Sequence, residues 1–176
     1  MNLNQKIIVT LLMLMTSVCF AASEARQSVT ISKANCNKLA NTAHAFVLVL
    51  NSGDHLNDSI SQCAKDAKLQ GATVSGLGQL VDPTFAYFSS DPNVKPALTK
   101  LSGVYELATV TGNISSNSGQ YFTHLHGIIA DEKFHGIAGH IQDAKVGLTA
   151  EITITPLSGT LKRKSDGKSG FSTLES

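Results

Sequence analysis

Short apolar runs separated by turn residues dominate the pattern along this chain. Residues 44–51 include the run Phe-Val-Leu-Val-Leu, which is too short for a comfortable helix and rich in β-formers, and so predicts a buried strand. Two more strands are predicted at residues 72–81 and 84–89, with Asp82-Pro83 as the break between them.

Alternation of side chains between two faces predicts further strands later in the chain. Residues 104–114 alternate in this way, with Tyr105, Leu107 and Thr109 on one face. Residues 146–155 place four apolar side chains on one face: Leu148, Ala150, Ile152 and Ile154. With the hairpin described below, the pattern amounts to about seven strands.

One segment has the periodicity of a helix. Its apolar side chains recur at helical spacing and form a single stripe: Leu56, Ile60, Cys63, Ala64 and Ala67. Asp54 is expected to cap the start of this helix, and Gly71 to provide the left-handed residue after its end. One main helix with a β-rich remainder predicts the α+β class, with an antiparallel or mixed sheet.

The stretch 121–141 contains four of the six histidines of the chain. Side chains on a strand alternate, so His124 and His126 are expected to project from the same face. The polar run that ends at Lys133 predicts a turn, and folding the chain there places His140 opposite His126. Three imidazoles then converge, whereas His135, beside the turn, and His55, at the start of the helix, are expected to be exposed.

The two ends of the chain have a different composition from the middle. Lys6 and the fourteen apolar residues after it predict a secretory signal peptide at 1–22, although an uncleaved membrane anchor is the alternative. A polar leader with little independent order is predicted at 23–43, and a disordered polar tail at 158–176. The basic run Lys162-Arg163-Lys164 in the tail is expected to be solvated. A single compact domain is expected at 44–157.

Charge and cysteine content bear on the compartment and on the partners. Cleavage removes Lys6 and no acidic residue, so 14 basic side chains become 13 against 13 acidic ones. This balance lacks the basic excess that is typical of nucleic-acid-binding domains. Export to the periplasm or the medium would allow Cys36 and Cys63 to form a disulfide, although Cys63 is equally suited to being a small buried residue of the helix.

Three segments carry a resemblance to a known family. Residues 71–80, Gly-Ala-Thr-Val-Ser-Gly-Leu-Gly-Gln-Leu, look like a small-residue strand that follows a helix. Residues 103–112 are similar to a G-R-F-E-I-L-S-L-x-G segment of plant proteins, and His-Leu-His at 124–126, Ala-Gly-His at 138–140 and Thr-Ala-Glu at 149–151 resemble a bacterial pattern. In this order the segments resemble the PPC domain, the plants and prokaryotes conserved domain.

The resemblance implies a fold, an assembly and a partner class. It implies a PPC-like domain in which the helix packs on a strongly bent, mostly antiparallel sheet, and which assembles as a homotrimer. It also brings an association with DNA binding, although the chain has no Arg-Gly-Arg-Pro hook. Val104 stands where plant members have arginine, and Phe134 stands where a turn glycine is usual.

The histidine cluster is the candidate for chemistry. Three neutral imidazoles suit a divalent metal, above all Zn²⁺, so His124, His126 and His140 are predicted as its ligands, with a fourth position left for water or a small polar ligand. The alternative is that they are packed strand histidines bonded to backbone or hydroxyl groups. Glu106 and Glu151 are candidates to orient an imidazole or to act as a general base, or else are carboxylates at a rim or subunit interface.

These features predict an exported PPC-domain protein that binds a divalent metal and a small polar ligand, with no membrane attachment after cleavage. A DNA-binding module and a metal-dependent hydrolase of unknown substrate are the alternatives. The sequence contains neither a phosphate-binding G-x-x-x-x-G-K-S/T loop nor a G-x-S-x-G nucleophile motif.

Overall fold

The structure is a computed structural model that describes residues 30–39, 44–91, 93–165 and 171–175. The predicted signal peptide lies outside the described residues. Two helical segments, the 3-10 helix η1 (Lys33–Leu39) and the α-helix α2 (Leu56–Asp66), pack on one large sheet. Within the described ranges, no helix is long and apolar enough to cross a membrane.

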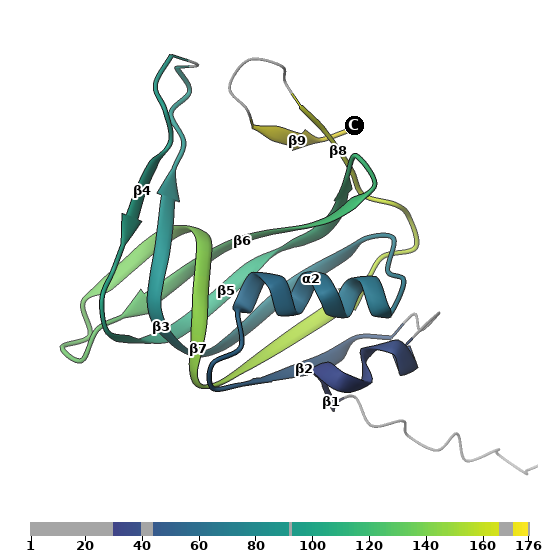
Figure 1. Cartoon of the computed structure of the whole chain (residues 1–176), viewed down its shortest axis with the longest axis horizontal. Helices are drawn as coiled ribbons and strands as arrows, with labels where there is room; N and C mark the ends of the chain where they lie inside the picture. Colours follow the sequence, from purple (N-terminus) through teal and green to yellow (C-terminus); the bar gives the residue numbers. More distant parts are fainter. Residues whose placement is uncertain (1–29, 40–43, 92, 166–170, 176) are drawn as a thin grey trace, which may run out of the picture.

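The described part of the chain forms nine strands in a mixed sheet, in the order β1-β2-β7-β3-β5-β8-β9 (Figure 1). The strands are β1 (Thr30–Ser32), β2 (Phe46–Asn51), β3 (Ala72–Tyr87), β4 (Ala97–Lys100), β5 (Val104–Asn117), β6 (Gln120–Ala130), β7 (Gly136–Pro156), β8 (Lys162–Ser165) and β9 (Ser172–Leu174). β4 pairs with β3, and β6 pairs with both β5 and β7. The pairings are antiparallel apart from β1–β2 and β5–β8. The predicted α+β class is confirmed.

Two predicted strand breaks are wrong, because bulges bend the strands without ending them. β3 continues through Asp82-Pro83: Asp82 has a φ of 48° and its carboxylate accepts the N–H of Gly103 at 2.8 Å. β7 is one strand of 21 residues that joins the histidine hairpin to the segment predicted at 146–155. In its register with β3, Ala150 lies opposite Gly78 and Val146 opposite Leu80.

A bulge in the pairing of β7 with β3 changes one predicted side-chain direction. Three residues of β7, 147–149, face a single residue of β3, Gln79. Leu148 lies in the middle of this bulge and is 74% exposed, while Val146 before it and Ala150, Ile152 and Ile154 after it are buried. Leu148 therefore does not share the core face, contrary to the prediction.

Helix α2 lies across one face of the bent sheet (Figure 1), and its predicted apolar stripe is buried. Its N-cap is His55 and not Asp54. The Asp54 carboxylate instead accepts hydrogen bonds from the backbone N–H of Asn51, at 3.0 Å, and from the Lys33 ammonium. Both bonds lower the pKa of Asp54, and the bond from Lys33 has the larger effect. After the helix it is Lys68, with a φ of 54°, that takes the left-handed conformation predicted for Gly71.

The segment before β2 is ordered where the structure describes it, so the expected lack of order is wrong for residues 30–39. β1 pairs in parallel with β2. Cys36 is fully buried and is joined to Cys63 of α2 by a disulfide with an S–S distance of 1.99 Å and a Cα–Cα distance of 5.1 Å. The cross-link holds this short polar segment against the helix, which its own composition could not do.

The described parts of the predicted disordered tail form a hairpin of β8 and β9. β8 joins the sheet beside β5, where Lys162 pairs with Ser116 and Arg163 with Asn117. Arg163 is only 7% exposed, so the prediction that the basic run is solvated is wrong for its central residue.

Candidate metal centre

The candidate site is built on the β6–β7 hairpin, in which His126 lies directly opposite His140, as predicted. Its turn spans residues 131–135. The Oδ1 atom of Asp131 accepts the backbone N–H groups of Lys133 and His135, each at 2.9 Å. Phe134 takes a positive φ of 63°, a conformation that usually favours glycine. The Asp131 bonds hold the turn and with it the register.

His124, His126 and His140 converge, with one possible ligand atom from each lying within 4.8 Å of the others. Their ring centroids are separated by 5.2 Å (His124–His126), 5.0 Å (His124–His140) and 5.5 Å (His126–His140). Alternation turns Leu125 and Ile141 the other way, into the core, where both are fully buried. The hydrophobic core thus fixes the face from which the imidazoles project.

The imidazole of His140 carries an unsatisfied polar atom. Its Nδ1 atom is buried and has no hydrogen-bond partner. Buried polar groups are almost always satisfied by a partner, so an orphaned imidazole nitrogen in a histidine cluster fits a group that binds at that position.

Two aromatic rings border the cluster. Phe88 follows β3, and its ring meets that of His140 edge to face at 5.3 Å. Phe171 precedes β9 and lies 5.3 Å from Phe88 and 6.1 Å from His124. In Figure 1 the β3–β4 and β8–β9 hairpins rise from the same side of the sheet, and these rings bring the two hairpins together at the histidines.

Arg163 is a site residue that sequence reasoning missed. Its Nη2 atom lies 3.1 Å from Nδ1 of His124. The guanidinium also donates to three oxygens: from Nη2 to Asn113 Oδ1 at 3.0 Å, from Nε to Ser115 Oγ at 2.8 Å and from Nη1 to Ser172 O at 2.7 Å. The guanidinium carbon also lies 4.7 Å from the ring centroid of Phe122. The only signal in the sequence was strand-like alternation in the basic run, which places Arg163 on the face opposite both lysines.

The environment keeps the imidazoles of His124 and His140 neutral. Burial, followed by the positive charge of Arg163 and the two neighbouring histidines, lowers the pKa of His124 to about 4. Burial also lowers the pKa of His140, with smaller contributions from His126 and Arg163. At neutral pH both rings are uncharged, the form that can coordinate a metal.

Glu106 and Glu151 do not lie at the cluster. Glu106 accepts a bond from Nε2 of Gln79 at 3.0 Å, beside a hollow of about 740 Å³ near the hairpin turn. Glu151 is exposed on β7, where it pairs with Val49 and Leu77. Among the described residues, no hydrogen bond joins either carboxylate to the three histidines, so neither contacts an imidazole as a base or an orienting group would.

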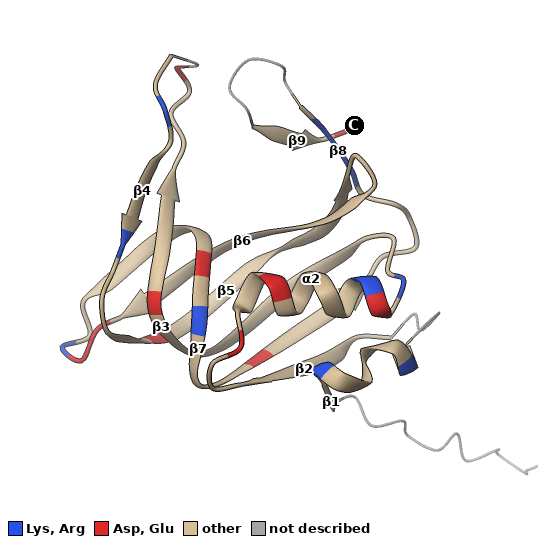
Figure 2. Ribbon diagram, viewed as in Figure 1, with Lys and Arg blue, Asp and Glu red and all other residues tan. Residues whose placement is uncertain are grey.

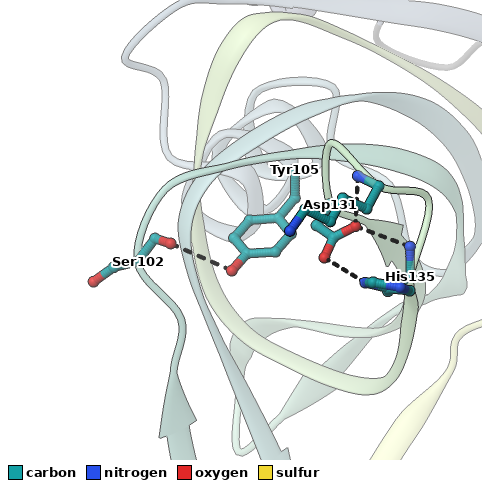
Figure 3. Close-up of polar contacts among 5 residues, drawn as sticks. Ser102, Tyr105, Asp131 and His135 are labelled. Carbon is teal, nitrogen blue, oxygen red and sulfur yellow. Dashed lines mark hydrogen bonds and ion pairs between the residues drawn. The ribbon is translucent and has the colours of Figure 1, made fainter.

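The remaining histidines lie apart from the cluster. His135 is exposed beside the turn, as predicted, and its Nδ1 atom is 3.0 Å from Oδ2 of Asp131 (Figure 3). The same view shows the hydroxyl of Tyr105 donating to the carbonyl of Ser102 at 3.3 Å. His55 contacts Asp143 at 3.3 Å through a partly exposed side chain.

Comparison with known proteins gives one family and several related structures. A model of the Plants and Prokaryotes Conserved (PCC) domain matches residues 38–158. Comparison with curated protein sequences gave no match.

Three solved structures illustrate the likeness. A plant- and prokaryote-conserved (PPC) protein of Pyrococcus horikoshii is 28% identical, with a TM-score of 0.70 over 76% of this chain and 92% of that one. A candidate DNA-binding protein of Ralstonia eutropha JMP134 is 27% identical, with a TM-score of 0.63 over 73% of this chain and 89% of that one. A metal-containing protein of Archaeoglobus fulgidus shares the fold at 22% identity, with a TM-score of 0.69 over 78% of this chain and 96% of that one.

Proposed function

This chain belongs to the Plants and Prokaryotes Conserved domain family, and from that premise we propose that it binds a divalent metal, zinc, through His124, His126 and His140. One observation carries the proposal: three imidazoles from a single hairpin converge within 4.8 Å. The buried, unpartnered Nδ1 atom of His140 supports it further.

The donor set fits the chemistry of zinc. Neutral imidazole is a preferred zinc ligand, and three of them leave one position for water or a small ligand. Two Zn–N bonds of 2.0–2.1 Å at the tetrahedral angle place their nitrogens about 3.4 Å apart, so modest side-chain rotations from the present arrangement suffice to gather the three rings around one ion. A zinc ion bound in this way polarises a carbonyl or lowers the pKa of a bound water to about 7. A hydrolase would also need a base, which neither Glu106 nor Glu151 supplies at the cluster.

Metal analysis tests the proposal. We expect mature protein from the exported fraction to contain about one zinc per chain by mass spectrometry, and the His124→Ala, His140→Ala double variant to contain almost none. His135→Ala is the matched control, because it removes a histidine of the same hairpin that lies outside the cluster. Equal metal content in the double variant and the control would contradict the assignment.

We also propose that the mature protein is exported to the periplasm or the medium. The Cys36–Cys63 disulfide supports this, because such bonds persist in oxidising compartments and are rare in the cytosol. The amino-terminal sequence, with its short basic start and apolar run, has the pattern of a secretory signal.

We propose a homotrimer as the assembly. Several large apolar side chains are exposed on the long strands, including Leu77 (53%), Ile128 (45%) and Leu148 (74%), which fits a surface that is covered in an oligomer. Light scattering on the mature protein is expected to give three times the mass of one chain. A single-chain mass over the whole concentration range would contradict the trimer.

A DNA-binding role has little support from the charges of this chain. The whole sequence has a formal net charge of +1, and Figure 2 shows acidic and basic residues scattered over the described elements, with no basic stripe that extends beyond β8. Binding to nucleic acid normally needs such a basic surface.

A further inference from the structure

We infer that the β8–β9 hairpin adapts the metal centre to an organic carboxylate, which Arg163 binds beside the histidines. This inference rests on the proposed function, and it names the class of ligand that the centre takes. Arg163 and Phe171 both lie beyond residue 158, where the family match ends. They therefore add a cation and an aromatic ring to a cluster whose three histidines lie inside the matched region.

The first argument is the burial of a cation. Arg163 is 7% exposed, and no carboxylate of the described residues forms an ion pair with it. Its polar partners are neutral: an amide, a hydroxyl, a carbonyl and an imidazole. A buried charge is normally paired, because removing it from water without a counter-charge is strongly unfavourable. An anionic ligand at the cluster would provide that counter-charge.

The second argument concerns the single lone pair of His124. A guanidinium can only donate, so Nδ1 of His124 accepts the bond from Arg163. A neutral imidazole has one N–H and one free lone pair. His124 therefore cannot coordinate a cation and accept this bond at the same time. When His124 serves as a ligand, one N–H of Arg163 becomes free next to the centre.

The number of free donors points to a carboxylate. A guanidinium has five N–H groups, and Ser115, Ser172 and Asn113 take one each. Release of His124 therefore leaves one N–H on each terminal nitrogen. A guanidinium with a free N–H on both terminal nitrogens can donate to both oxygens of a carboxylate, which is the usual bidentate partner of arginine.

The walls of the site indicate the rest of the ligand. Phe88 and Phe171 lie against the imidazoles and against each other, with centroids 5.3 to 6.1 Å apart. An aromatic or aliphatic body attached to the carboxylate can pack on these rings. Inorganic phosphate has no such body, and its further oxygens would need more donors than Arg163 offers. The site therefore favours an organic carboxylate over phosphate.

Calorimetric titration of the full mature protein, with and without zinc, tests the inference. Benzoate is the probe, benzamide its neutral isostere and inorganic phosphate the competing anion. We expect the zinc-loaded protein to bind benzoate at least tenfold more tightly than benzamide or phosphate. No heat from benzoate at millimolar concentration, equal binding of benzamide, or tighter binding of phosphate would each overturn it.

A variant pair assigns the effect to Arg163. Arg163→Gln is expected to weaken benzoate binding roughly 10- to 150-fold, the range for losing a hydrogen bond to a charged group, while zinc content is unchanged or higher. Lys164→Gln is the matched control, because it removes the same charge from the next, exposed position. Unchanged benzoate affinity in Arg163→Gln would refute the role of Arg163.

The outcomes separate this inference from the proposed function. Absence of zinc from the wild type would remove the metal-centre proposal, whereas zinc without benzoate binding would remove only the carboxylate assignment. If Arg163→Gln fails to fold, the three-probe comparison on the wild type decides the question alone.

Discussion

Replacing Gly112 with alanine is expected to lower the free energy of unfolding by about 3 kcal/mol, the upper part of the range for overpacking, and to lower zinc affinity at least tenfold. Gly112 lies on β5, directly opposite Leu125 of β6. A Cβ atom there would lie 1.9 Å from the carbonyl oxygen of His124 and 2.9 Å from its carbonyl carbon. These atoms belong to the backbone and cannot rotate away, so β6 must move at His124 itself.

Chemical denaturation and zinc analysis measure the two effects together. Gly136→Ala is the matched control, because a Cβ at this hairpin position meets nothing within 4 Å. We expect the control to keep the stability and the zinc content of the wild type. An unfolding curve of Gly112→Ala that coincides with that of the control would show that β5 and β6 are not packed as described.

Reduction of the Cys36–Cys63 disulfide is expected to destabilise the protein by about 3.5 kcal/mol. The two cysteines are 27 residues apart, and the chain-entropy relation for a closed loop of that size gives this value. For a domain of this length it corresponds to a fall in melting temperature of roughly 7–14 °C. Zinc binding is expected to persist, because the three histidines project from β6 and β7 on the face opposite to the buried Leu125 and Ile141, and none of them contacts η1 or the disulfide among the described residues.

Thermal unfolding with and without a reductant checks this prediction. The Cys36→Ala, Cys63→Ala double variant provides the control, since its melting temperature should be low in both conditions and insensitive to the reductant. A wild type that melts at the same temperature in both conditions would contradict the stabilising role of the bond.

The histidine hairpin could be predicted because its determinants are local. A period of two fixes the faces of His124 and His126, and a polar turn fixes the partner of His126. Even the unfavourable Phe134 did not shift the register, because the Asp131 carboxylate supplies the turn with its own hydrogen bonds. Helix α2 was predictable for the same reason, since its buried stripe is a local periodic pattern.

The errors share a different physical cause: their determinants are distant in sequence or involve bulges. Nothing in the residues around Arg163 shows that its hydrogen-bond partners are Asn113, Ser115 and His124, which are distant in sequence. The segment itself is polar and lacks apolar periodicity, so its composition resembles that of a disordered segment. Leu148 was misplaced because it lies within a bulge, where the alternation on which the prediction depended is interrupted. Residues 30–39 were misjudged because a cross-link, and not their own composition, anchors them.

The origin of all three imidazoles in one hairpin also bears on the order of assembly. All three ligands lie within the 17 residues 124–140, so closing this loop costs little chain entropy. Hairpins of this kind form within about 1–10 μs. Arg163 and the disulfide join elements that are far apart along the chain, and such non-local contacts form slowly. The ligand set is thus kinetically independent of the arginine beside it. A cation can meet its three histidines on a nascent chain before Arg163 arrives to occupy the lone pair of His124.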